Sequence, residues 1–159
     1  MRAIAPGRVN LIGDHTDYTG GLVFPMAINR HTIIDAHFTE DSSISLKSAD
    51  EPEVASFNIP VGDISSLHPQ WARYIAAVAT ECKASRGIAG TISTDIPIGS
   101  GLSSSAALEI ATALALGFDG SAKELAQLTQ RAEHVATGVP TGIMDQLCIS
   151  AAREHHAMM

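Results

Sequence analysis

Apolar and polar residues alternate over short segments in the N-terminal half of the chain, which is the pattern of strands with one buried face. The alternation is clearest over residues 32–38 and 91–96. Pro6 and Gly7 interrupt the first apolar run, and the polar residues 14–21 predict a loop. The pattern therefore predicts strands at residues 2–5, 22–24, 32–38, 44–47 and 91–96.

The C-terminal half changes to the 3.6-residue period of helices. Apolar spacing predicts a helix over residues 71–83. Residues 103–116 are apolar almost all round, which is typical of a central, buried helix. Ser121 and Glu124 form a capping box for a third helix, over residues 122–136. Because strands come first and helices later, without regular alternation, the pattern indicates one α+β domain rather than a doubly wound sheet.

Composition and charge exclude several classes of protein. The 159 residues suffice for one domain, and a hydrophobic fraction of 45% fits an ordered chain. A formal net charge of −7 disfavours nucleic acid or an anionic membrane as a partner. No apolar run reaches the roughly 18 residues of a membrane helix, and the first residues lack the apolar region of a signal peptide. We therefore expect a cytoplasmic protein in which Cys82 and Cys148 are reduced.

A glycine- and serine-rich segment, residues 97–107, separates the predicted strand 91–96 from the predicted helix 103–116. Glycines let backbone N–H groups approach an anion, and the start of a helix adds about half a positive charge. The segment contains no G-K-[ST], and Ser104 occupies the third glycine position of G-x-G-x-x-G. Two interpretations stay open: a phosphate-binding loop without a lysine, or a strand-to-helix turn with a serine N-cap.

Polar groups of several kinds gather near the N-terminus, in residues 6–18. Carboxylates beside a hydroxyl and an imidazole can hydrogen-bond several sugar hydroxyls at once, although such a loop can equally be a solvated turn. The candidates for sugar contact are Asp14, His15, Thr16 and Asp17.

Two further carboxylates lie in the C-terminal half. Glu133 projects to the edge of the apolar face of the helix 122–136, where a carboxylate needs a cation or a donor. An arginine and Mg²⁺ both fit that need. Asp145 follows a segment rich in glycine and proline, and its position alone favours a helix N-cap.

Three segments resemble the GHMP kinases, in the order in which that family carries them. Residues 97–107 are similar to the family's phosphate loop. Residues 6–28 resemble the N-terminal motif of its galactokinase branch, and residues 141–146 resemble the Gly-x-Met-Asp-Gln motif of that branch. The resemblance covers essentially the whole chain and implies an α+β GHMP kinase N-terminal domain, like the second domain of ribosomal protein S5.

The resemblance also implies a reaction, in which the γ-phosphoryl group of ATP passes to the anomeric hydroxyl of galactose with the help of Mg²⁺. Asp145 would be the catalytic base, and Arg8 would lie beside it and the transferring group. Ser105 and Glu133 would hold the Mg²⁺. The sugar would contact Asp14, His15, Thr16, Asp17 and Gly142. The nucleotide would contact Ser48, Trp71, Gly99, Ser100, Gly101, Leu102, Ser103, Ser104 and Ser105.

One residue departs from the galactokinase pattern, because Asp14 stands where those enzymes usually carry Glu. The shorter side chain should weaken or re-route one hydroxyl contact. A related kinase for N-acetylgalactosamine or arabinose therefore stays open. A non-catalytic sugar sensor of the same fold is the other alternative, although Arg8, Glu133, Asp145 and the intact serine run speak against it.

The chain stops on apolar residues, 157–159, which predict the start of another strand. We therefore expect a truncated form, since a ferredoxin-like C-terminal domain normally follows in GHMP kinases. The full-length protein is expected to be a monomer. The 159-residue chain alone is expected to be weakly active or inactive.

Overall fold

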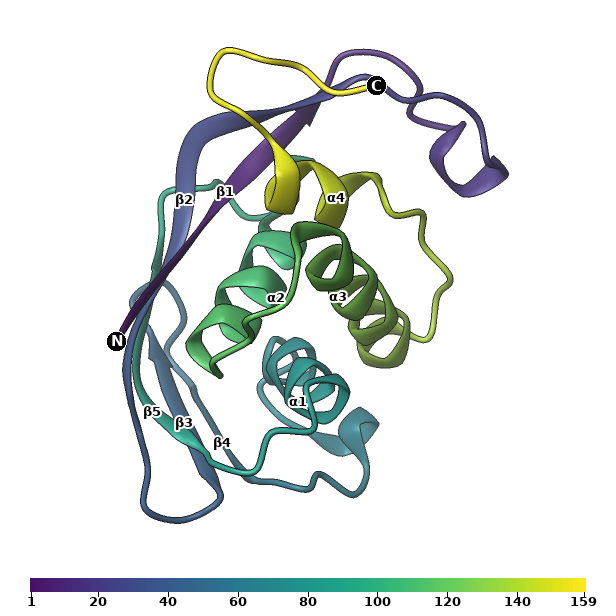
Figure 1. The fold of residues 1–159 in the computed structure, drawn as a ribbon. Helices are drawn as coiled ribbons and strands as arrows, with labels where there is room; N and C mark the ends of the chain where they lie inside the picture. The colour runs from purple at the N-terminus through teal and green to yellow at the C-terminus, as the bar shows by residue number, and fades with distance from the viewer.

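The structure is a computed structural model that describes residues 1–159. Five strands form one sheet in the order β1-β2-β5-β3-β4, and four helices cover one of its faces (Figure 1). The strands are β1 (Arg2–Asn10), β2 (Pro25–Phe38), β3 (Ser43–Ser48), β4 (Val54–Asn58) and β5 (Ile88–Thr94). The helices are α1 (Ala72–Glu81), α2 (Ser104–Ala115), α3 (Ala122–Thr137) and α4 (Met144–Ala151). Two short 3₁₀ turns, Asp17–Thr19 and Ile64–Ser66, lie in connections.

The sheet is mostly antiparallel, and only β3 and β5 run parallel to one another. Alternation along β1 places Ala3 and Ala5 in the core, while Ile4 between them is exposed. Small residues at these positions let α2 pack closely on the edge of the sheet. The edge strand therefore lies next to the start of α2, which carries the glycine–serine loop.

Helix α2 occupies the centre of the helical layer, between the sheet and the other helices (Figure 1). It buries Ala106, Ala107, Glu109, Ile110, Ala111, Thr112, Ala113 and Ala115. The apolar pattern of residues 103–116 predicted this position, and the prediction is confirmed. The α+β class is confirmed as well.

Three expectations about the strands were wrong. Residues 22–24 form no strand, because β1 ends at Asn10 and no strand lies beside them; only Phe24 makes backbone hydrogen bonds there, with Leu11 and Ile12. Proline at position 6 does not end β1, which continues to Asn10 with a register shift between Pro6 and Arg8. Because β1 is an edge strand, it tolerates the missing N–H of proline. Strand β4 was missed, since its five residues carry no extended alternation.

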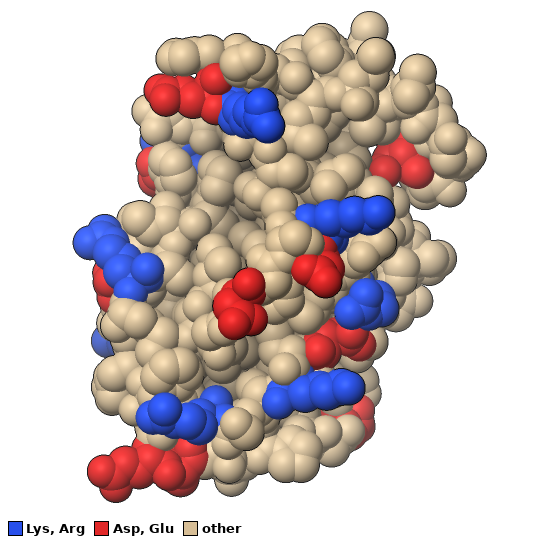
Figure 2. All heavy atoms as spheres, viewed as in Figure 1, with Lys and Arg blue, Asp and Glu red and all other residues tan.

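The surface carries acidic and basic side chains in alternation on the face shown in Figure 2, without a large patch of one sign. No helix in the structure has the length and apolar character needed to cross a membrane. Cys82 and Cys148 are both free. Burial raises the pKa of each thiol to about 11, so both are neutral and poorly nucleophilic at neutral pH.

Candidate functional site

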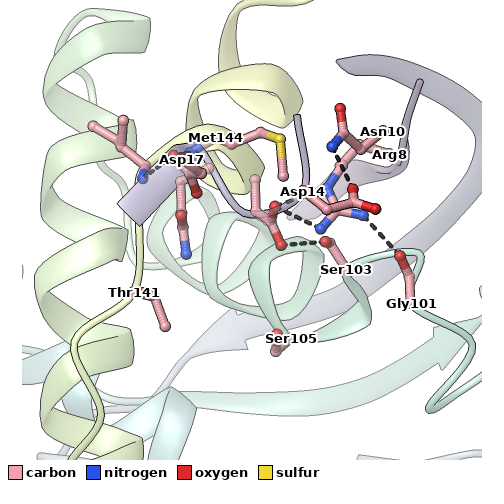
Figure 3. Close-up of polar contacts among 12 residues, drawn as sticks. Arg8, Asn10, Asp14, Asp17, Gly101, Ser103, Ser105, Thr141 and Met144 are labelled. Carbon is pink, nitrogen blue, oxygen red and sulfur yellow. Dashed lines mark hydrogen bonds and ion pairs between the residues drawn. The ribbon is translucent and has the colours of Figure 1, made fainter. Parts of the chain in front are cut away.

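Arg8 connects three segments that are distant in sequence: the end of β1, the loop before α2, and the start of α4 (Figure 3). Its Nε donates to Oδ1 of Asp145 at 2.7 Å, and its second terminal nitrogen lies 2.6 Å from the same oxygen. The other terminal nitrogen donates to the carbonyl of Gly101 at 2.7 Å. Since the side chains of Arg8 and Asp145 are only 12% and 25% exposed, these charge-assisted bonds are largely shielded from water.

The loop before α2 has a backbone shape that depends on glycine. Gly99 and Gly101 have φ values of 74° and 75°, in the left-handed region. Ser103 also lies in this region, with φ of 58°. Its hydroxyl donates to Oδ2 of Asp145 and makes no capping bond to α2. The structure therefore does not support the simple serine N-cap, and the hydroxyl instead orients the carboxylate.

Asp145 is not the N-cap of α4. Ile143 occupies that position, and Asp145 lies in the first turn of the helix, where the helix dipole favours a negative charge. Its two carboxylate oxygens have separate partners, since Arg8 holds Oδ1 and Ser103 holds Oδ2. This arrangement fixes the direction of the carboxylate.

Ser105 and Glu133 come together from α2 and α3. The Ser105 hydroxyl donates to Oε1 of Glu133 at 3.2 Å, and Oε2 accepts from Thr141 at 3.1 Å and from Gln146 at 2.8 Å. No arginine pairs with Glu133, so the expectation of an ion pair there is not met.

The oxygen atoms of Ser105 and Glu133 fit a magnesium site of a particular kind. Both are hard ligands, which Mg²⁺ prefers. No group of three or more His, Cys, Asp or Glu side chains could hold a metal in this structure. Ser105 and Glu133 would supply two ligands, and the rest would come from phosphate and water, as is common for Mg²⁺ at nucleotide sites.

The sugar candidates lie in the loop that follows β1, and their side chains make different contacts. Asp14 is exposed and accepts from Asn10 at 2.5 Å (Figure 3). His15 is exposed, and its Nδ1 lies 2.9 Å from the Tyr18 hydroxyl. The Thr16 hydroxyl contacts the carbonyls of residues 13 and 22, so it closes the loop on itself.

Asp17 reaches the start of α4. Its Oδ1 accepts from the backbone N–H groups of Ile143 and Met144, both at 3.1 Å. It thereby satisfies donors that the helix leaves free at its N-terminus. Gly142 lies against the same carboxylate, where an added Cβ would collide with Asp17. The loop after β1 and the start of α4 are therefore held to one another directly.

A cavity of about 220 Å³ opens beside the serine run. Ser104 and Ser105 line one part of it, and Ser48 and Trp71 line it as well. The Trp71 Nε1–H group is buried without a hydrogen-bond partner. The remaining lining residues are Thr32, Glu51, Tyr74, Ile92, Thr94, Ile98 and Leu108. The structure thus gathers four nucleotide candidates around one cavity, while Gly99 and Ser100 lie exposed on the loop at its side.

Burial changes the ionisation of three groups around the site. Burial raises the pKa of Asp17, although the two amide bonds from α4 oppose this effect. Burial also raises the pKa of Tyr74, and the charges of Glu133 and Glu109 act in the same direction. The pKa of Glu109 lies well above its usual range, because the side chain is buried and Glu133 lies nearby.

Several residues of the site were not identified from the sequence. Glu109 and Gln146 are fully buried, and Thr141 contacts Glu133. Their sequence neighbourhood gives one usable signal, since a charged residue in the apolar run 103–116 needs a partner. Tyr74 carries no comparable signal, because it lines the cavity together with residues from distant segments. Asn10 was missed although its contact with Asp14 is local.

Comparison with known proteins adds independent findings. The profile of the GHMP kinases N terminal domain matches residues 72–152, and that of the galactokinase galactose-binding signature matches residues 1–37. A galactokinase of Canis lupus familiaris is 41% identical over 167 residues, which cover 98% of this chain and 43% of the relative. A galactokinase of Chloroflexus aggregans is 42% identical over 168 residues, covering 99% of the chain and 42% of the relative.

Solved structures agree with the sequence comparisons. The Lactococcus lactis galactokinase complexed with galactose superposes with a TM-score of 0.86 at 33% identity, over 98% of this chain and 43% of that one. The Methanococcus jannaschii mevalonate kinase superposes with a TM-score of 0.81 at 24% identity, over 96% of this chain and 51% of that one, which shows a shared fold.

A lysine-free loop at the start of a buried helix, with an arginine–aspartate pair beside it, defines the class, and the chain belongs to the GHMP kinase family. Within that family it resembles the N-terminal portion of galactokinases, and it spans about 43% of the length of such curated relatives.

Proposed function

We propose that this chain is the ATP-binding and sugar-binding portion of a galactokinase, which transfers the γ-phosphoryl group of ATP to the anomeric hydroxyl of galactose. The observation that carries the proposal is the position of Asp145, held by Arg8 and Ser103 at the end of the glycine–serine loop. A nucleotide whose phosphates lie on that loop would have its terminal phosphoryl group next to this carboxylate. The galactokinases among its relatives support the choice of reaction and sugar.

In this proposal Asp145 is the base that orients the acceptor hydroxyl and takes its proton. Phosphoryl transfer depends chiefly on positioning and charge neutralisation, so the base needs only to orient the hydroxyl and accept its proton. Arg8 holds the carboxylate in place through its two contacts with Oδ1, and its third contact ties it to the loop. The arginine is thereby placed to neutralise charge on the transferring group.

The loop would hold the triphosphate with backbone N–H groups, serine hydroxyls and the dipole at the start of α2. Ser48 and Trp71 would contact the rest of the nucleotide in the adjoining cavity, where the buried Nε1–H of Trp71 has no partner within the protein. Ser105 and Glu133 would hold Mg²⁺, which supplies charge neutralisation between the phosphates when bound. Ser105 lines the same cavity, and its hydroxyl donates to Glu133.

The sugar would lie between the loop after β1 and the start of α4. Asp14 is hydrogen-bonded to Asn10 at the end of β1, and Asp17 with Gly142 borders the helix that carries Asp145. His15 and Thr16 complete the loop, although their polar groups contact the loop itself in the structure. The sugar site is therefore incomplete without movement of this loop or contacts from further chain. We propose that the second domain normal to GHMP kinases supplies such contacts, since the relatives are more than twice as long.

The test is a substrate panel with galactose, N-acetylgalactosamine and arabinose, followed by ³¹P NMR of the sugar phosphates. The full-length gene product should favour galactose, and the 159-residue chain should show feeble turnover or none.

Asp145→Asn in the full-length product should lower kcat by about 10²–10⁴-fold, because the amide cannot accept the proton.

Each other result favours a different function. A preference for N-acetylgalactosamine or arabinose would assign the protein to a related kinase, as the shorter Asp14 allows. Binding of ATP and galactose without product by the full-length protein would make it a sugar sensor.

A further inference from the structure

Two glutamates share one glutamine in the core beneath the candidate magnesium site. Gln146 Nε2 donates to Oε2 of Glu133 at 2.8 Å and to Oε2 of Glu109 at 3.3 Å. Glu109 and Gln146 are both 0% exposed. The proposed reaction does not use Glu109. Burying a carboxyl group at the centre of α2 costs free energy unless hydrogen bonds or a function compensate for it.

The position of Glu109 relates it to the site. It lies four residues after Ser105 on α2, so the two side chains lie on the same face of that helix, one turn apart. Gln146 follows Asp145 directly on α4. Glu109 therefore lies beneath both the serine that contacts Glu133 and the helix that carries the candidate base.

Two buried oxygens of this cluster lack a hydrogen-bond partner, namely Oε1 of Glu109 and Oε1 of Gln146. Burial raises the pKa of Glu109 well above its usual range, and the charge of Glu133 raises it further. Glu109 is thus expected to carry a proton. An acid O–H that donates to the amide oxygen of Gln146 satisfies both oxygens at once, in the same way that acids and amides pair through two hydrogen bonds.

We propose that Glu109 is a positioning residue: paired with Gln146, it fixes the amide that directs the Glu133 carboxylate toward Ser105. The inference rests on the proposed function only in assigning Ser105 and Glu133 to Mg²⁺. Gln146 alone cannot hold this direction, because its amide oxygen has no other partner in the core. Residues that hydrogen-bond to a metal ligand, without contacting the metal, typically contribute about 10–100-fold to metal affinity.

The experiment compares three variants of this chain. Glu109→Leu removes both hydrogen-bonding atoms at similar volume. Glu109→Gln keeps a neutral donor and acceptor, so it should rescue the arrangement. Thr112→Val is the matched control, since Thr112 is equally buried on α2 but its hydroxyl contacts only the carbonyl of Leu108.

Two measurements are made on each variant. The first is the ¹H–¹⁵N signal and hydrogen exchange of the Gln146 side-chain amide, which needs no ligand. The second is Mn²⁺ binding in the presence of ATP, measured by electron paramagnetic resonance. Glu109→Leu should shift the Gln146 signal, accelerate its exchange, and weaken Mn²⁺ binding about 10–100-fold. Glu109→Gln and Thr112→Val should match the original chain in both.

The two readouts separate this inference from the proposed function. Absence of Mn²⁺ binding by the original chain with ATP would count against the proposed function, while the Gln146 signal would still decide the role of Glu109. An unchanged Gln146 signal in Glu109→Leu would overturn the inference. Equal loss of Mn²⁺ binding in Thr112→Val would overturn it as well, because the effect would then be general damage to α2.

Discussion

Arg8 supplies three nitrogen atoms to the candidate site, and no other residue type could replace it. Two of them contact one oxygen of Asp145, and the third contacts the glycine–serine loop. A lysine offers one ammonium group and could make only part of this set. The residue types of the site could be predicted from the sequence, because they recur in familiar motifs. Their mutual contacts could not, since Arg8 and Asp145 are 137 residues apart.

Removing Arg8 should lower the stability of the fold as well as impair the proposed reaction. Arg8→Ala leaves the Asp145 carboxylate shielded and without a cation, which should lower the free energy of unfolding by about 3 kcal/mol. Adding Asp145→Asn should recover part of this loss. Urea denaturation measures both. Arg30→Ala is the control, because its ion pair with Asp95 is exposed and should contribute less than about 1 kcal/mol. Equal losses in the two single variants would contradict the argument.

Gly142 should tolerate no side chain. A Cβ there meets the carboxylate of Asp17, so Gly142→Ala should cost about 1–3 kcal/mol of unfolding free energy, as overpacked sites do. Gly62→Ala is the matched control, since nothing lies within 4 Å of its added Cβ. Thermal denaturation of both variants decides the point. A neutral Gly142→Ala would mean that Asp17 can move aside freely.

At the level of elements, caps explain which helices the sequence could predict. The capping box of Ser121 and Glu124 is present at the start of α3, as the sequence predicted. Helix α4 has no such local signal, because its N-terminal amides are capped by Asp17 from a distant loop. The strand expected at residues 22–24 failed for the opposite reason: its apolar residues suggested a strand, but no neighbouring strand pairs with them.

Helix α4 should loosen when its distant cap is lost. Asp17→Ala removes the acceptor for two amides, so the free energy of unfolding should fall by about 0.5–2 kcal/mol, which is typical of a lost cap. Hydrogen exchange at Ile143 and Met144 should accelerate. Asp17→Asn keeps an acceptor oxygen and should preserve slow exchange at both amides. Fast exchange in Asp17→Asn too would show that the charge, rather than the acceptor, holds the helix.

For the molecule as a whole, the raised pKa of the buried Glu109 couples stability to pH. The pKa of Glu109 is higher in the folded protein than its ordinary value of 4.5. The folded state therefore binds more protons in this range, and the stability contributed by the neutral acid is lost as pH rises through the folded pKa. The class of fold and its central helix were predictable from apolar periodicity, but this coupling was not, because it arises where three helices pack together.

Glu109→Gln should remove that dependence. The free energy of unfolding of Glu109→Gln should increase relative to that of the original chain as pH rises from about 4.5 toward alkaline values. Below that range the two should differ by a constant amount. Chemical denaturation at a series of pH values measures the difference. A difference that is independent of pH would show that Glu109 is ionised in the folded protein.

The distance along the chain between Arg8 and Asp145 also orders events during synthesis. Since Asp145 follows Arg8 by 137 positions, and ribosomes add about 5–20 residues per second, the guanidinium is made roughly 7–27 seconds before its carboxylate. During that interval the nascent protein carries a cation whose anion does not yet exist. The Arg8–Asp145 ion pair, which joins β1 to α4, therefore forms only once the start of α4 has been translated.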